Sequence, residues 1–146
     1  MASDHTSTQM PGMPAAAEPE DRIRVLVVED DLSLRLFTTL VLASEGYAPT
    51  GVGTVERALV RLGRGGVDLV LTDLIMLGRD GGLDLLQHMR DRGLRTPVLA
   101  MTGSDDGELT GKALALGALS VLRNPFTRTA LAVAVRSALD GGRQAA

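Results

Sequence analysis

The sequence predicts a three-layer, doubly wound α/β domain built on a five-stranded parallel sheet. From Ile23 onward, short runs of β-branched and aliphatic residues alternate five times with longer segments of helical period. The third run, residues 67–72, is apolar at nearly every position, as in a parallel strand that helices cover on both faces. Successive strand–helix units of this kind favour a sheet with helices on either side.

The predicted elements follow this alternation along the chain, and glycine residues mark several helix ends. The strand-like runs cover residues 23–28, 47–52, 67–72, 97–101 and 119–122. The helix-like segments cover residues 32–44, 55–62, 82–91, 108–116 and 127–139. The expected helix stops are Gly46, Gly65 with Gly66, Gly93 and Gly117.

The composition excludes several classes of function. The chain has 146 residues and a net charge of −3, so we expect no basic surface for nucleic acid. It contains no cysteine, which rules out disulfides, zinc–thiolate sites and a thiol nucleophile. Its apolar runs are far shorter than the roughly twenty residues of a membrane span, and the N-terminus lacks the features of a secretory signal. We therefore expect a cytoplasmic protein with no membrane partner.

The acidity of the chain is concentrated at its N-terminus. Residues 1–21 hold three of the six prolines and no lysine or arginine, and we expect them to form a disordered, acidic tail. We expect one globular domain over residues 22–142, a short tail over residues 143–146 and no output domain.

Acidic side chains follow the first and third predicted strands at the point where each strand ends. Glu29 and Asp30 come directly after the first strand, and Asp73 comes after the third. Open parallel sheets bind ligands at the carboxyl ends of their strands, so we expect these carboxylates to meet there. Close carboxylates repel one another unless a cation neutralises them, and an all-oxygen ligand set favours Mg²⁺. A single acid after a strand is more commonly a helix cap, so the prediction depends on the combination.

Asp73 is the candidate nucleophile of this group. A carboxylate beside a divalent cation can attack phosphorus and form an acyl phosphate. Asp73 stands alone at its strand end, whereas Glu29 and Asp30 are placed as metal ligands. Thr102 follows the fourth strand, where its hydroxyl can donate to an oxygen of the transferred group. Gly103 permits close backbone approach to the same group, and a plain turn is an equal alternative there.

These residues and their spacing resemble the receiver domain of bacterial two-component response regulators, over residues 22–140. The resemblance rests on residues 25–31 with Arg35, on residues 71–74, 76–83 and 97–103, and on the dipeptides at 117–118 and 125–126. It implies a flavodoxin-like sheet with strand order 2-1-3-4-5, and a cis peptide bond between Asn124 and Pro125. It also implies a stand-alone signalling protein rather than a metabolic enzyme.

The resemblance further implies roles for the residues of the site. Asp73 would be the phosphoacceptor, and Thr102 and Gly103 would contact the phosphoryl group. The implied Mg²⁺ ligands are Glu29, Asp30, Asp73 and the backbone carbonyl of Ile75. The phosphoryl donor would be a sensor histidine kinase or a histidine phosphotransfer protein.

Three positions depart from the pattern of the family. Asn124 stands where receivers have a lysine that reaches the phosphoryl group, Val121 where an aromatic side chain rotates, and Leu77 where proline is usual. A neutral amide cannot replace an ammonium charge, and valine has no ring to swing. We expect Leu77 to loosen the loop beside Asp73. Together, these departures predict altered or absent phosphorylation-dependent switching.

Neither nearby cation is well placed to substitute for the missing lysine. Arg123 directly precedes Asn124, and strand alternation directs its side chain away from the site. Lys112, the only lysine of the sequence, lies on the fourth predicted helix and would have to fold back.

The segment from residue 108 to residue 139 carries two helices that are apolar on more than one face. In receivers this face binds partners and forms dimers, so the resemblance implies a downstream protein target or a homodimer here. The helix propensity of alanine explains the same pattern equally well. An alternative function is a pseudo-receiver, a phosphorylation-independent binding module whose acidic pocket has no role. An enzyme of another flavodoxin-like type is disfavoured, because no glycine-rich phosphate loop follows the first strand.

Overall fold

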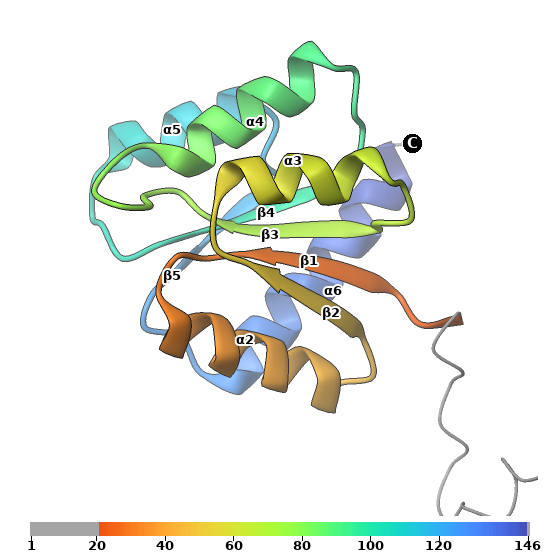
Figure 1. The fold of residues 1–146 in the computed structure, drawn as a ribbon. Coiled ribbons are helices and arrows are strands. Elements are labelled where there is room, and N and C mark those ends of the chain that lie inside the picture. Colours follow the sequence, from red (N-terminus) through yellow and green to blue (C-terminus); the bar gives the residue numbers. More distant parts are fainter. Residues whose placement is uncertain (1–20, 146) are drawn as a thin grey trace, which may run out of the picture.

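The computed structural model describes residues 21–145, in which helices and strands alternate along the chain (Figure 1). The strands are β1 (Arg24–Val28), β2 (Ala48–Val52), β3 (Leu69–Asp73), β4 (Val98–Thr102) and β5 (Ser120–Arg123). The helices are α2 (Leu32–Ser44), α3 (Val55–Gly63), α4 (Gly81–Asp91), α5 (Gly107–Ala115) and α6 (Arg128–Ala145). Every strand pairing is parallel, and the order in the sheet is β2-β1-β3-β4-β5. The three-layer α/β fold and the implied strand order are therefore confirmed.

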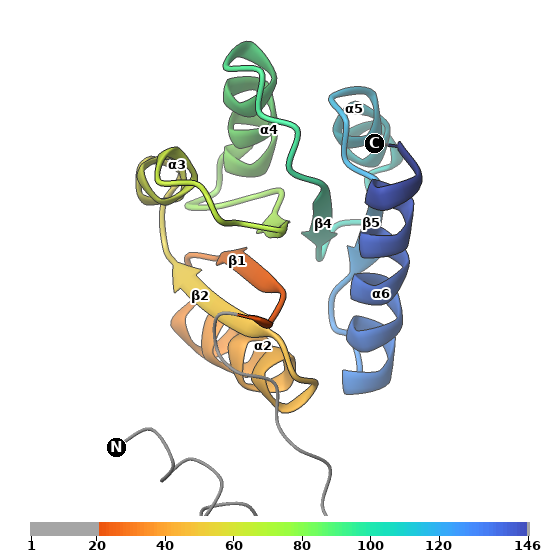
Figure 2. The same cartoon turned by 90° about the vertical axis from the view of Figure 1, so that its right-hand side faces the viewer.

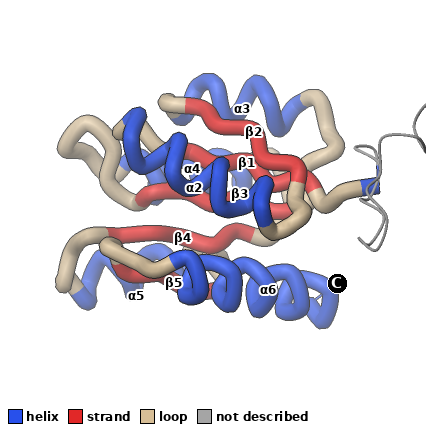
Figure 3. The backbone as a smooth tube through the Cα atoms, turned by 90° about the horizontal axis from the view of Figure 1, so that it is seen from below, coloured by secondary structure: helices blue, strands red, loops and turns tan. Residues whose placement is uncertain are grey.

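The sheet divides the interior into two apolar cores, because successive side chains of a strand point to opposite faces. On β1, Leu26 and Val28 belong to the core formed with α3, α4 and α5, whereas Val25 and Val27 belong to the core formed with α2 and α6. Figure 2 shows the strands lying between these two groups of helices, and Figure 3 shows α2 and α6 on the face of the sheet seen from below. Burial on both faces explains why the central strands are apolar at nearly every position.

Side chains that accept backbone N–H groups determine where several helices begin. Asp31 accepts the N–H of Leu34 at 3.1 Å at the start of α2, and Thr54 accepts the N–H of Arg57 at 3.1 Å at the start of α3. Asp106 caps α5 in the same way. These caps begin each helix shortly after a strand ends, so the connecting loops stay short and hold their side chains near the sheet.

The last helix is longer than the sequence predicted. We expected it to end at residue 139, followed by a tail at residues 143–146, but α6 continues to Ala145. Gly142 serves close packing inside this helix. A Cβ at Gly142 would lie 2.9 Å from the side chain of Pro97. Gly142 therefore lets α6 approach the segment that leads into β4.

The other boundaries agree with the predicted ones to within two residues, and those of α2 are identical. The expected tail at residues 1–21 lies outside the described residues except for Asp21. Within residues 21–145, no helix combines the length and the apolar character that crossing a bilayer requires.

Gly82 allows α4 to begin directly against the end of β3. A Cβ at Gly82 would lie 2.2 Å from the carbonyl oxygen of Asp73 and 2.6 Å from the Cα of Leu74. The Gly82 N–H donates to the carbonyl of Leu74 at 3.0 Å. This close approach ties the start of α4 to the strand that carries Asp73.

Replacing Gly82 with alanine should therefore destabilise the fold. We expect the free energy of unfolding to fall by about 2 kcal/mol or more, because the added methyl group overlaps backbone atoms of β3. Gly111→Ala is the matched control: Gly111 lies inside α5 with open space around it, so alanine should stabilise the chain there by about 0.5–1 kcal/mol. Urea denaturation of both variants measures these changes. Equal stability of Gly82→Ala and the parent chain would contradict the close approach.

Candidate functional site

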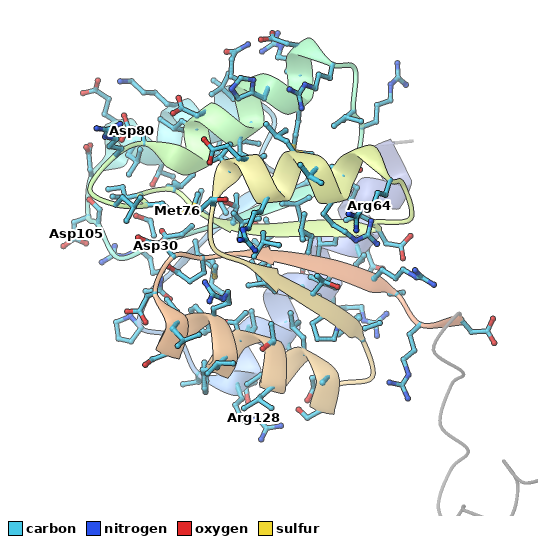
Figure 4. The ribbon with its side chains drawn as sticks, viewed as in Figure 1. Asp30, Arg64, Met76, Asp80, Asp105 and Arg128 are labelled. Atoms are coloured by element: carbon cyan, nitrogen blue, oxygen red, sulfur yellow. The ribbon has the colours of Figure 1, made fainter. Side chains whose placement is uncertain are left out.

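Three carboxylates meet where β1 and β3 end. Glu29 and Asp30 directly follow β1, and Asp73 is the last residue of β3. The two strands are neighbours, with Val28 opposite Thr72, so their ends lie side by side. One oxygen from each of the three carboxylates lies within 4.8 Å of those of the others. The predicted convergence of Glu29, Asp30 and Asp73 is therefore present (Figure 4, where Asp30 marks this edge of the sheet).

Glu29 is the most buried member of this acidic cluster. Its side chain is 1% exposed, and Oε2 accepts the N–H of Asp31 at 3.1 Å. Oε1 is buried with no hydrogen-bond partner among the described residues. Burial raises the pKa of Glu29 to about 8; the Asp31 N–H opposes this shift, and the carboxyl groups of Asp73 and Asp30 add to it.

The pKa values of the other two carboxyl groups shift in opposite directions. Burial raises the pKa of Asp73; the Ile75 N–H and the neighbouring Glu29 carboxyl oppose this shift, and the charge of Asp30 adds to it. The Ile75 N–H donates to Asp73 Oδ1 at 3.3 Å. Burial also acts to raise the pKa of Asp30, but hydrogen bonds outweigh it, the largest coming from the Leu77 N–H, and the net shift is downward. The protein thus favours ionisation of Asp30 and disfavours ionisation of Glu29 and Asp73.

The cluster fits a hard divalent cation. Its donors are all oxygens, and a carboxylate oxygen of Glu29 is buried without a partner. A cation between the three groups would stabilise their ionised forms, which the protein alone does not neutralise. Among residues 21–142, no lysine or arginine forms an ion pair with any of the three carboxylates.

Arg35 supports the cluster through the backbone. Its Nη1 donates to the carbonyl of Glu29 at 2.8 Å, and its side chain lies against Gly51 and Gly53. A Cβ at Gly53 would come within 2.8 Å of the same Nη1. Sequence reasoning placed Arg35 in a motif but missed this role, because the partner is a backbone carbonyl that no residue type signals.

The loop between β3 and α4 is more ordered by hydrogen bonds than we expected. Met76 and Arg79 exchange two backbone hydrogen bonds, at 2.8 and 3.0 Å, across a two-residue turn. The Leu77 N–H donates to Asp30 Oδ2 at 2.8 Å. Leu77 supplies a hydrogen bond that proline, which has no N–H, cannot make, and the expectation that Leu77 loosens the loop stays a prediction.

Thr102, Gly103 and Asn124 lie together at the end of β4. Thr102 is 1% exposed, and its Oγ1 accepts the N–H of Ser104 at 3.1 Å. The Asn124 N–H donates to the carbonyl of Thr102 at 2.7 Å, and a Cβ at Gly103 would lie 4.0 Å from the Cβ of Asn124. Asn124 Oδ1 is buried with no hydrogen-bond partner in the described part of the chain. The Asn124–Pro125 peptide bond is cis, as the resemblance implied.

The two cations considered as substitutes for a lysine at position 124 pair with other acids. Lys112 Nζ lies 3.3 Å from Glu108 on the exposed side of α5. Arg123 pairs with Asp105 in the loop that follows β4, at the edge of the sheet where Figure 4 places Asp105. Val121 is partly buried against the core beside α5 and presents no ring to the surface.

Comparisons with known proteins agree with this architecture. The family model described as "Response regulator receiver domain" matches residues 25–136. The chain is 36% identical over 115 residues to the transcriptional regulatory protein PmrA of Pectobacterium parmentieri, covering 79% of this chain and 51% of that protein. It is 34% identical over 118 residues to the sensory transduction protein RegX3 of Mycolicibacterium smegmatis, covering 81% of this chain and 51% of that protein. The chain thus spans about half the length of these curated relatives.

A solved structure shows the same fold. The signal receiver domain of a putative LuxO repressor protein from Vibrio parahaemolyticus superposes with a TM-score of 0.77 at 26% sequence identity. The match covers 84% of this chain and 94% of that one, so it includes both the sheet and the helices around it.

Stability should depend on pH through Glu29. Glu29 binds its proton more tightly in the folded chain than in the unfolded one, so stability falls as the pH rises from about 4.5 to about 8. Glutamine cannot ionise, and Glu29→Gln should therefore become more stable than the parent chain over this range, by about 2–4 kcal/mol at pH 8 and above. Urea denaturation at a series of pH values, with a chelator present, measures the difference.

Glu45→Gln is the control for this experiment, because Glu45 is exposed at the end of α2. Its stability should follow that of the parent chain at every pH. If the free energies of unfolding of Glu29→Gln and the parent chain change in parallel from pH 5 to above pH 8, burial does not raise the pKa of Glu29.

Proposed function

The chain belongs to the response regulator receiver domain family, and from this premise we propose that its Asp73 carboxylate accepts a phosphoryl group in two-component signalling. Members of this family are signalling proteins rather than metabolic enzymes. The observation that carries the assignment of Asp73 is the acidic cluster, in which Asp73 ends the central strand and the other two carboxylates flank it within 4.8 Å.

Glu29, Asp30, Asp73 and the backbone carbonyl of Ile75 are the proposed ligands of Mg²⁺. When bound, the cation would neutralise negative charge on the oxygens of the transferred phosphoryl group. The orphaned Glu29 Oε1 and the opposed pKa shifts of the three carboxyl groups support this assignment. The protein holds the carboxylates in place before any ligand arrives, through the N–H groups of Asp31, Ile75 and Leu77.

In the proposed transfer, an ionised oxygen of Asp73 attacks the phosphorus of a phosphohistidine on the donor protein. The bond from phosphorus to the imidazole nitrogen breaks, the imidazole keeps the electron pair and takes up a proton, and an acyl phosphate forms on Asp73. The hydroxyl oxygen of Thr102 already accepts the Ser104 N–H, so its proton is available to a phosphoryl oxygen. Gly103 leaves space beside Thr102 for that oxygen.

Asn124 distinguishes this site from the pattern that the family resemblance implied. Its amide can donate a hydrogen bond but brings no positive charge, and Lys112 and Arg123 pair with other acids. We propose that the phosphorylated site carries more uncompensated negative charge with asparagine at position 124 than it would carry with lysine there. With valine at position 121, the response of the chain cannot use a rotating aromatic side chain.

The phosphoryl donor is proposed to be a sensor histidine kinase or a histidine phosphotransfer protein that docks on α2, and the chain is proposed to act in the cytoplasm. Four large apolar side chains of α2 are exposed: Leu32, Leu36, Phe37 and Leu40. The ring of Phe37 lies 6.1 Å from that of Phe126, which follows Pro125 in the loop after β5. Both rings line an apolar hollow of about 560 Å³ that also includes Gly103 and Asn124, so this surface adjoins the site.

The downstream protein target is proposed to bind the face formed by residues 108–139. Leu114, Leu119 and Val133 are large apolar side chains exposed on this face. A second copy of the chain is the other proposed occupant. The comparisons, which match the response regulator receiver family and a transcriptional regulatory and a sensory transduction protein, do not favour the alternative of a binding module without phosphorylation.

A small phosphodonor tests the proposed acceptor directly. Incubation with acetyl phosphate and Mg²⁺ should add one phosphoryl group to the chain, measured by intact mass. Asp73→Asn should abolish this addition, because the amide is not a nucleophile. Asp84→Asn, at an exposed acid of α4, is the control and should leave the addition unchanged. Full labelling of Asp73→Asn would place the acceptor elsewhere.

Position 124 should limit the rate of this reaction. Asn124→Lys places an ammonium group beside the transferred phosphoryl group, and we expect the initial rate of labelling to rise about tenfold or more. Asn124→Met, which has similar length but no charge, is the control and should not accelerate labelling. Equal rates in the two variants would show that charge at this position does not limit the transfer.

A further inference from the structure

We propose that the backbone N–H of Leu77 is a positioning group for the metal site, which fixes Asp30 as a ligand through a strained turn. The inference rests on the proposed function, because it assigns a role to a group next to the proposed Mg²⁺ ligands. It depends on the shape of the turn, on the exposure of the Leu77 side chain and on the hydrogen bond to Asp30.

The turn belongs to a type that few residues tolerate. Met76 and Arg79 pair as an antiparallel bridge, and the two residues between them, Leu77 and Gly78, have φ angles of +54° and +71°. Two-residue turns with positive φ at both positions normally carry asparagine, aspartate or glycine. Gly78 meets this requirement, whereas a leucine at the first position is sterically disfavoured.

The Leu77 side chain does not compensate for this conformation. It is 79% exposed, so it gains little from packing, and Leu77 is the only residue other than glycine with positive φ in the described part of the chain. Strained backbone of this kind persists where the surrounding structure requires it, commonly at functional sites. The contact that the conformation does provide is the hydrogen bond from the Leu77 N–H to Asp30 Oδ2, at 2.8 Å.

That hydrogen bond joins a loop after β3 to a carboxylate after β1. It occupies Oδ2 of Asp30, and one oxygen of the same carboxylate lies within 4.8 Å of oxygens of Glu29 and Asp73. A charge-assisted hydrogen bond to a fixed peptide group reduces the number of orientations that the Asp30 carboxylate can take. Partners of metal ligands commonly contribute ten- to a hundredfold to metal affinity by this means.

Three changes at position 77 separate the N–H from the side chain. Leu77→Ala keeps the N–H and removes most of the side chain, so Mg²⁺ affinity should stay within about twofold of the parent chain. Leu77→Pro removes the N–H and cannot adopt a positive φ. Replacement of Leu77 by the corresponding α-hydroxy acid, which exchanges the N–H for an ester oxygen, removes the donor and keeps the shape of the side chain.

The experiment measures Mg²⁺ dissociation constants by titration calorimetry, with no phosphodonor present. We expect about tenfold weaker binding for the proline and ester variants and unchanged binding for Leu77→Ala. Circular dichroism checks the fold of each variant, and the ester variant decides the result if Leu77→Pro does not fold. Parent-like affinity in the ester variant would overturn the role of the N–H while leaving the metal site intact. Failure of the parent chain to bind Mg²⁺ would instead refute the proposed metal site, and this inference with it.

Discussion

The carboxylates of Glu29, Asp30 and Asp73 repel one another across the ends of β1 and β3, and the surrounding structure is arranged to hold them together. Backbone N–H groups from the chain after each strand meet their oxygens. On one side, Arg35 stabilises the end of β1 by donating a hydrogen bond to the Glu29 carbonyl. On the other, Gly82 lets α4 begin in contact with the end of β3. The two apolar cores offset the free-energy cost of holding these acidic groups close together. Burial of the strands on both faces keeps the strand ends in register.

Most of the fold follows from patterns visible in the sequence. Residues of β1 alternate between two cores, and the apolar run of β3 requires cover on both faces, so both signals indicate the sheet correctly. The predicted end of α6 was wrong, because the sequence alone does not show that Gly142 packs closely against Pro97, which is distant in sequence. A glycine that permits close packing and one that ends a helix look the same until the neighbouring segment is known.

The acidic cluster could be predicted from the sequence, whereas the hydrogen bonds that hold it in place could not. Carboxylates at the carboxyl ends of adjacent parallel strands meet whatever the details of the loops, so Glu29, Asp30 and Asp73 could be grouped from topology alone. The role of Leu77 could not be predicted, because leucine is an unusual residue in a left-handed turn and the sequence pattern does not indicate such a turn here. The absence of proline at position 77 predicts a less rigid loop, whereas the N–H of Leu77 makes a hydrogen bond to Asp30 across the site.

The contact between Phe37 and Phe126 connects the proposed docking surface on α2 with the segment that borders the phosphoryl site. Phe126 is two residues beyond Asn124, and Phe37 belongs to the exposed apolar face of α2. A donor protein seated on α2 would rest partly on the segment that borders the phosphoryl group it delivers. The donor would then contact both the surface on which it docks and the segment that carries Asn124.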